Sequence, residues 1–259
     1  MKKLFSVAVL MGTSLALAQH PSDADVTALI EKGRQKALAY RESLPDFLAT
    51  EVVRRYTGIA HHMNTVPVDT LTIQLRYFQH TEEHKLVLFN GEPTERRFDS
   101  LEGFVGTGEF GTTLSAIFDP ASQTTFEWRK WKTLRSRPGA VLAYVVDVAH
   151  SAYRLESQIR DRAEAVLVSY QGVVELDVET GEVLRLEYEA DHIPKELHIE
   201  SVATSVDYAL ADIGGRVYLL PSHAESEVRG LEEWAKSVIK FQDYRKFTAD
   251  SVVDFGPVK

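Results

Sequence analysis

The segment 171-QGVVELDVETGEVLRLEYE-189 decides the fold, because two apolar-rich runs in it are separated by an acidic turn that ends at Gly181. We expect strands over residues 173–177 and 182–190. Glycine suits the turn because it adopts positive φ without a steric penalty. The segment therefore predicts an antiparallel hairpin.

Strand patterns continue on both sides of this hairpin. In residues 70–78, apolar and polar side chains alternate, which is typical of a strand with one buried face. The run 85–92 contains Asn90-Gly91, which favours a two-residue hairpin turn because both central positions need positive φ. Gly214-Gly215 indicates another turn. Further strands are expected over residues 124–132, 140–148, 152–157, 163–170, 198–210, 216–228 and 236–247. Strands with short connections pair with their neighbours, so we expect a meander in one curved sheet.

Helical patterns are few. Ser22 followed by Asp25 resembles a capping box, and the apolar residues after it recur at helical spacing as far as Pro45. Residues 108–118 predict a short helix packed on one face of the sheet. Residues 225–236 indicate a helical turn or a mobile loop. The expected fold class is α+β, with a curved antiparallel sheet, an N-terminal helix and one or two short helices over its concave face.

Residues 1–18 have the pattern of a cleavable export signal. Lys2 and Lys3 precede an apolar run that closes on Ala16-Leu17-Ala18, and small residues at these positions suit signal peptidase. The run is shorter than the roughly 20 residues that span a bilayer, which argues against an uncleaved membrane anchor. We therefore expect cleavage after Ala18 and a single β-rich domain over residues 19–259.

Composition limits the function. The chain has 29 basic and 38 acidic residues and a net charge of -9, and loss of residues 1–18 makes it -11. This acidity argues against nucleic acid as a partner. The most basic segment, 128-WRKWKTLRSR-137, is a solvated strand face or a contact for an anionic lipid headgroup. The chain has no cysteine, so it lacks disulfides and the cysteine that anchors a bacterial lipoprotein, and Gln19 stands at that position. We expect a soluble periplasmic or secreted protein.

Two motifs have both a chemical and a structural interpretation. Residues 106–111 fit the G-x-G-x-x-G pattern that binds pyrophosphate, but no parallel strand leads into them, so a glycine-rich turn before a helix is the alternative. His80-Thr81-Glu82-Glu83-His84 fits the inverted zinc-peptidase signature. That chemistry needs both histidines on one helical face, whereas the flanks predict strands. A polar loop tip, or adventitious metal binding, is the alternative for this motif and for His61-His62.

No catalytic signature is found in the sequence. There is no G-x-S-x-G elbow and no cysteine nucleophile, and carboxylate spacing along a chain cannot identify a glycosidase pair. We therefore expect a protein that is not an enzyme and that has no cofactor, no catalytic residue and no metal-ligating residue.

Large apolar side chains are frequent on the expected strands. Most should form the core, and the rest could line a cavity between the curved sheet and its helices. They are Phe47, Phe78, Phe89, Phe126, Trp128, Trp131, Tyr144, Tyr188, Tyr208, Tyr218, Phe241 and Phe247.

Three segments resemble the periplasmic lipoprotein-carrier superfamily, the LolA/LolB-like proteins, which includes lipid-sensing envelope-stress regulators. They are 171–189, 212-DIGGRVYLLP-221 and 241-FQDYRKF-247. The resemblance implies a half-open antiparallel barrel closed by helices, with an apolar cavity for acyl chains. The segment 108-GEFGTTLSAIFDPAS-122 is similar to a group of uncharacterised exported bacterial proteins. Neither resemblance assigns a binding residue.

The function expected from these observations is the binding of an apolar or acylated ligand in that cavity. The alternative is an envelope interaction or scaffold module that engages a protein partner through a sheet edge or an acidic face. A metal-dependent hydrolase is a more distant third.

Overall fold

The computed structural model describes residues 20–59, 65–98, 101, 110–134, 136–159 and 162–247. The helices are α1 (Asp23–Ser43) and α2 (Thr112–Phe118), with single turns at η2 (Pro120–Ser122), η3 (Val148–His150) and η4 (Lys195–Leu197). The strands are β1 (Phe47–Ile59), β2 (Val66–Phe78), β3 (Thr81–Phe89), β4 (Glu92–Pro93), β5 (Thr125–Leu134), β6 (Arg137–Val146), β7 (Arg154–Ile159), β8 (Arg162–Leu167), β9 (Ser169–Asp177), β10 (Val183–Asp191), β11 (Ile199–Ile213), β12 (Arg216–Gly230) and β13 (Glu233–Lys246).

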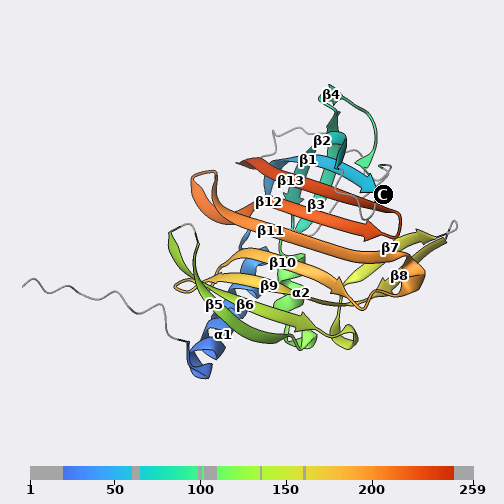
Figure 1. Cartoon of the computed structure of the whole chain (residues 1–259). Coiled ribbons are helices and arrows are strands. Elements are labelled where there is room, and N and C mark those ends of the chain that lie inside the picture. The colour runs from blue at the N-terminus through green and yellow to red at the C-terminus, as the bar shows by residue number, and fades with distance from the viewer. Residues whose placement is uncertain are drawn as a thin grey trace, which may run out of the picture.

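One large antiparallel sheet dominates the fold. Its eleven strands run in the order β4-β3-β2-β1-β13-β12-β11-β10-β9-β6-β5, and β7 and β8 form a separate hairpin. The first strand, β1, pairs with the last strand, β13, so these two strands lie side by side in the middle of the sheet. The sheet is curved and remains open at β4 and β5, as expected of a half-open barrel (Figure 1).

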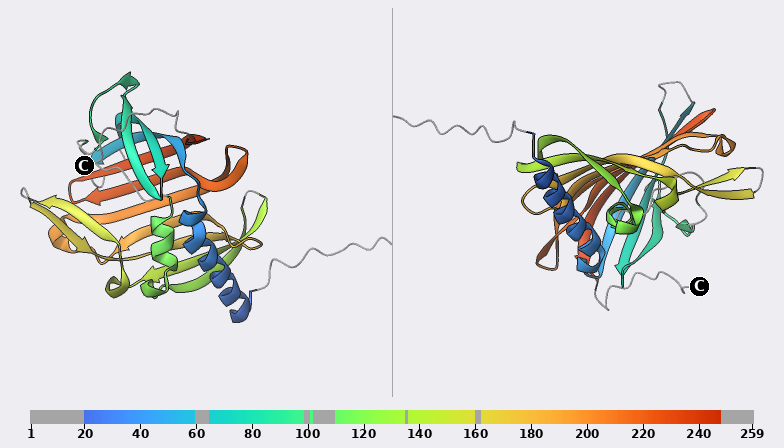
Figure 2. Two further views of the ribbon diagram at one scale, coloured as in Figure 1. Left: turned by 180° about the vertical axis from the view of Figure 1, so that it is seen from behind. Right: turned by 90° about the horizontal axis from the view of Figure 1, so that it is seen from below.

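Both helices lie on the inner face of the sheet. Seen from behind, α1 and α2 stand side by side against the strands, and from below the sheet curves around them (Figure 2). The strands β4 and β5 lie at opposite edges of the sheet, so the chain between Pro93 and Thr125 must cross from one edge to the other. Helix α2 belongs to this crossing, which explains its place inside the curve.

The predicted start of α1 is confirmed. The Ser22 hydroxyl accepts from the Asp25 backbone N–H at 3.2 Å, and the Asp25 carboxylate accepts from the Ser22 backbone N–H at 3.2 Å, which completes a capping box. The helix ends at Ser43, before Pro45, as expected. Gly33 allows close contact with the sheet, because a Cβ there would lie 2.9 Å from Leu176 Cδ1.

The predicted turns are also confirmed. Asn90 and Gly91 have φ of 53° and 84°, and they join β3 to β4 as a two-residue turn with positive φ at both positions. Gly181 has a φ of 76° between β9 and β10, and Gly214 and Gly215 form the positive-φ turn between β11 and β12.

Three expectations about the elements were wrong or incomplete. Residues 225–236 are neither helix nor loop, since they belong to β12 and β13 and the turn between them. The Glu225 carboxylate and the Lys236 ammonium group lie 2.6 Å apart across the β12–β13 pair. The polar residues of this segment therefore belong to the solvent-facing side of two strands. The strands expected at 152–157 and 163–170 form mainly the β7–β8 hairpin and leave the large sheet. Phe47 was expected on a strand, but residues 47–59, which form β1, were not among the expected strand ranges.

The core lies between the inner face of the sheet and the helices. A main apolar cluster joins α1 and α2 to the middle of the sheet, and a second cluster of Leu155, Val168, Ala190, Leu197 and Val202 lies beside the β7–β8 hairpin. Within the described ranges, no helix is both long enough and apolar enough to cross a membrane.

Candidate ligand-binding site

A cavity of about 640 Å³ opens on the inner side of the sheet, between β3, α2 and the strands that carry the second apolar cluster. Its size falls within the range of roughly 300–1,000 Å³ that is usual for small-molecule sites. The lining residues are Arg41, His80, Thr81, Glu82, His84, Thr112, Thr113, Ala116, Ala152, Tyr153, Tyr170 and Tyr188.

Helix α2 supplies the wall between the two ends of the cavity. Leu114, Ile117 and Phe118 are buried in the main apolar cluster, at the spacing of one helical face. The other face carries Thr112 and Ala116, together with Thr113, toward the cavity. The helix is therefore fixed by its apolar side and presents small side chains to the open space.

One end of the cavity is aromatic. The Tyr153 ring lies 5.5 Å from Tyr170 and 5.6 Å from Tyr188, with interplanar angles of 72° and 90°, so three rings meet nearly at right angles. Burial raises the pKa of Tyr170 to about 12 and raises that of Tyr153 further, and nearby Tyr188 contributes to both shifts. In the described part of the chain, neither the Tyr153 nor the Tyr170 hydroxyl has a hydrogen-bond partner.

Gly172 makes room beside these rings. It pairs with Tyr144 on one side and Tyr188 on the other, and the Tyr144 hydroxyl donates to the Glu187 carbonyl at 3.0 Å. A Cβ at Gly172 would lie 1.9 Å from that carbonyl oxygen and 2.9 Å from the Tyr144 oxygen. Only glycine fits this position without a shift of the backbone.

The other end of the cavity is polar. The Arg41 guanidinium donates to the His80 carbonyl at 2.8 Å, and the His80 ring contacts the Arg41 carbonyl at 3.1 Å. His84 Nε2 lies 3.4 Å from Glu51 Oε1, with side-chain exposures of 12% and 5%. Glu82 faces the same side of β3 as His84. Burial raises the pKa of the Glu82 carboxyl group. The Glu51 charge adds to this shift, whereas His84 and Arg41 oppose it.

A row of polar residues, most of them buried, crosses the inner face of the sheet. The row follows the neighbouring strands β2, β1, β13, β12, β11 and β10. In that order, cross-strand pairing aligns Asp69, Arg55, Ser237, Ser226, Thr204 and Tyr188. Arg55 holds Asp69 through two hydrogen bonds of 2.7 Å and 2.6 Å, and the hydroxyls of Thr204 and Ser226 lie 3.0 Å apart. This polar row separates the two apolar clusters and reaches the cavity at Tyr188.

The structure does not bring the histidine motif together as a metal site. His80 lies in the turn before β3 and contacts Glu42 at 3.3 Å, whereas His84 lies on the strand and contacts Glu51. Among the residues that the structure describes, no group of three or more potential ligands could hold a metal ion. His61-His62 and residues 106–109 lie outside the described residues. Gly111, with a φ of 104°, immediately precedes α2.

The basic segment 128–137 lies on the edge strand β5 and the start of β6, and its cations are largely paired. Arg129 contacts Glu127 at 2.9 Å, Lys132 contacts Glu175 at 2.6 Å, and Arg137 lies between Asp177 and Glu182. These pairs reduce the charge available to an anionic headgroup.

A second cavity, of about 750 Å³, lies between the start of α1 and β5, next to His20 and Trp128. Most of its polar groups already have partners, since Ser22 bonds Asp25 at 2.6 Å and Lys32 donates to two backbone carbonyls. The buried indole N–H of Trp128, which lines this second cavity, has no partner among the described residues. The inner cavity is the stronger candidate because both of its ends hold polar groups without partners.

The sequence indicated only part of this lining. It grouped His80, Glu82 and His84 in one motif and placed Tyr188 on a strand. The lining residues that it did not single out are Arg41, Thr112, Thr113, Ala116, Ala152, Tyr153 and Tyr170. No local signal marks them, because they meet only after the sheet curves.

Comparisons with known proteins give similarities of fold. No protein-family model matches the chain, and no curated protein matches it. The chain is similar to the crystal structure of LolA superfamily protein NE2245 from Nitrosomonas europaea, with 12% identity, coverage of 89% of this chain and 97% of that chain, and a TM-score of 0.42. It is also similar to a DUF1329 family protein from Desulfovibrio piger, with 11% identity, coverage of 90% and 97%, and a TM-score of 0.42. The first similarity is to the superfamily that the sequence segments resemble, and neither assigns a functional residue to this chain.

Proposed function

We propose that this protein is an exported binding protein that takes an amphiphilic ligand into the inner cavity and holds its apolar or acyl part there. The observation that carries the proposal is the cavity of about 640 Å³, with tyrosine rings at one end and charged groups at the other. The export signal predicted over residues 1–18 and the calculated acidity of the remaining chain are consistent with a role in the cell envelope.

The driving force would be burial of apolar surface. Each methylene group of an acyl chain that leaves water contributes about 0.8 kcal/mol. The ring faces of Tyr153, Tyr170 and Tyr188 and the Ala116 methyl group supply the apolar contact. The Tyr153 and Tyr170 hydroxyls, which have no partner among the described residues, would keep their hydrogen bonds with water or with polar atoms of the ligand.

The polar groups of the cavity support binding rather than turnover. His84 contacts a carboxylate, and His80 contacts a carboxylate and a backbone carbonyl. Within the described residues, the His80 imidazole is not hydrogen-bonded to a hydroxyl that lines the cavity, as the base of an activated nucleophile would be.

A titration with N-phenyl-1-naphthylamine, a neutral dye that fluoresces in apolar surroundings, tests the proposal. The protein expressed from its full sequence should bind the dye. Ala116→Phe, on the wall of the cavity, and Ala152→Trp, at its mouth, should each weaken binding by about tenfold or more by filling the space.

Ala149→Trp is the matched control, because Ala149 is exposed in η3, three residues before Ala152, and does not line the cavity. It should bind the dye like the unmodified protein. Circular dichroism and thermal unfolding would establish that each variant is folded. Absence of dye binding to the unmodified protein, or unchanged binding in a folded Ala116→Phe variant, would contradict the proposal.

A further inference from the structure

We propose that the cavity selects amphiphiles whose head carries an ammonium group, and that Glu82 is the residue that receives this head. The inference rests on the proposed function and adds the chemical class of the ligand. Glu82 is the second residue of β3, pairs with Tyr77 across the β2–β3 ladder and lines the cavity. Tyr77 is buried on the inner face, so the Glu82 side chain is on that face too.

Glu82 differs from the other charged groups at this end because its carboxylate forms no hydrogen bond or ion pair with a described residue. Burial nevertheless withdraws it from water and raises its pKa. A half-buried carboxylate in this state gains from a cation or an N–H donor that enters the cavity.

The neighbouring basic side chains are already engaged. The Arg41 guanidinium donates to the His80 carbonyl, and the His84 imidazole faces the buried Glu51 carboxylate. Glu51 and Glu82 thus place two carboxylates near one permanent cation, Arg41. An anionic head would meet this excess of negative charge, whereas an ammonium head would reduce it.

The opposite end of the cavity fixes the orientation of the ligand. Tyr153, Tyr170 and Tyr188 offer ring faces and edges, which suit an alkyl tail. The ammonium group would then lie at the Glu82 end, with α2 alongside the chain between the two ends. Both a long-chain amine and an aminolipid with an ethanolamine head carry the required group.

The preference for an ammonium head group can be tested by displacing the dye with three probes that share the same twelve-carbon tail. Dodecylamine should displace it at a concentration at least about tenfold lower than dodecanol, the effect expected of one charge-assisted hydrogen bond. Dodecanoate should be the weakest of the three. Glu82→Gln should remove the preference for the amine and leave the affinity for dodecanol within about twofold, because the substitution keeps the shape and removes the charge.

Glu83→Gln is the matched control. Glu83 is the next residue of the same strand, on the outer face, where it forms an ion pair with Arg76. This variant should keep the order of the three probes. A fourth probe, lauroyl lysophosphatidylethanolamine, distinguishes the sources: displacement as strong as that by dodecylamine identifies an aminolipid, and weaker displacement identifies a simple amine.

The outcomes separate the two proposals. Equal displacement by dodecylamine, dodecanol and dodecanoate would overturn the preference for an ammonium head group. It would leave the proposal of an apolar binding cavity intact. An unchanged preference in a folded Glu82→Gln variant would overturn the role of Glu82. Failure of all the probes, together with no dye binding, would overturn the proposed function itself. The comparison of probes on the unmodified protein needs no variant, so a folding defect cannot obscure it.

Discussion

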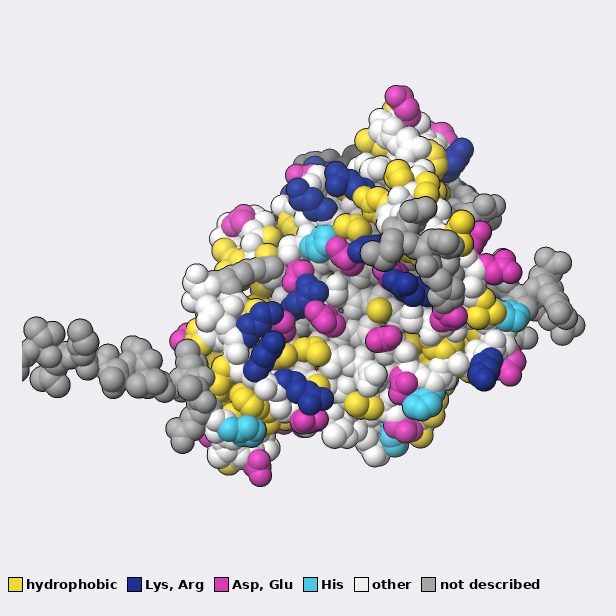
Figure 3. Space-filling view, viewed as in Figure 1, with side chains coloured by type: hydrophobic (Ala, Val, Ile, Leu, Met, Phe, Trp, Pro, Cys, Tyr) yellow, Lys and Arg dark blue, Asp and Glu magenta, His cyan; other side chains and the backbone are white. Residues whose placement is uncertain are grey.

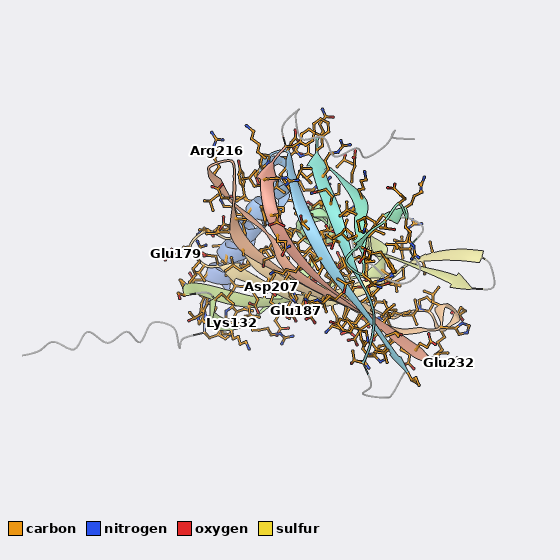
Figure 4. All side chains as sticks on the ribbon, turned by 90° about the horizontal axis from the view of Figure 1, so that it is seen from above. Lys132, Glu179, Glu187, Asp207, Arg216 and Glu232 are labelled. Atoms are coloured by element: carbon orange, nitrogen blue, oxygen red, sulfur yellow. The ribbon has the colours of Figure 1, made fainter. Side chains whose placement is uncertain are left out.

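The outer and inner faces of the large sheet differ in how far their charged and polar side chains are paired with one another. On the outer face, Arg185 contacts Glu187 at 2.7 Å and Asp207 at 2.6 Å, and Lys236 contacts Glu225 at 2.6 Å. Figure 3 shows basic and acidic side chains interspersed over this face, and Figure 4 labels Glu187 and Asp207 on it. Opposite charges are partnered within the chain, as expected of a solvated surface.

On the inner face, several polar groups around one cavity have no partner among the described residues. They include the Glu82 carboxylate and the hydroxyls of Tyr153 and Tyr170. Other polar groups on that face are paired, as in Arg55 and Asp69, whereas the buried indole N–H of Trp128 has no partner among the described residues. A carboxylate and hydroxyls that face one cavity and have no hydrogen-bond partner within the described residues are available to a ligand that enters it.

The largest effect should come from breaking an ion pair on the inner face. Asp69→Ala leaves the Arg55 guanidinium buried without its carboxylate, and side-chain exposures of 10% and 5% place this pair away from water. We expect a loss of about 3–5 kcal/mol in the free energy of unfolding, measured in urea.

The outer-face comparison is Glu225→Ala, which breaks the pair with Lys236. Because Glu225 is 41% exposed, the expected loss is below about 1 kcal/mol. Similar losses for the two variants would remove the contrast between the faces.

A smaller effect should follow from filling the gap beside the tyrosines. Gly172→Ala forces a Cβ against the Glu187 carbonyl oxygen, so the strands β9 and β10 must shift. We expect a loss of about 2–3 kcal/mol. Gly215→Ala is the control, because its Cβ meets no atom within 4 Å and only the positive φ of 87° opposes it. That substitution should cost about 1 kcal/mol. Equal unfolding midpoints would show that the inner face is not close-packed there.

The smallest effect concerns alkaline pH. The folded-state pKa of Tyr170 is about 12, above its ordinary value of 10.0, so ionisation favours the unfolded chain once the pH exceeds about 10. Its contribution to stability is complete below that pH and is lost as the pH rises toward 12. Tyr170→Phe should therefore gain about 1 kcal/mol over the unmodified protein between pH 7 and pH 11. Urea unfolding at the two pH values measures this, and an unchanged difference would show that Tyr170 is not buried.

Much of the fold could be predicted from the sequence because its signals are local. The capping box at Ser22, the turn at Asn90-Gly91 and the alternation in residues 70–78 each depend on neighbouring residues alone. The error at residues 225–236 has a local cause too, since polar residues on a solvent-facing strand resemble those of a loop.

The site was harder to predict because it depends on distant pairings. Arg41 comes from α1, Glu82 from β3 and Tyr170 from β9, and these elements meet only because β1 pairs with β13 and the sheet curves. The histidine motif drew attention to the correct segment for the wrong reason. The residue of this motif that matters for the proposal is Glu82. Its spacing from other residues along the chain does not reveal which residues face it across the cavity.

The most direct measurement of the central claim is native mass spectrometry of the protein purified without detergent from its own host. The account predicts a bound amphiphile that contains nitrogen, retained in the Ala149→Trp variant and lost in the Ala116→Phe variant. A bare chain in every preparation, together with no uptake of N-phenyl-1-naphthylamine, would contradict it.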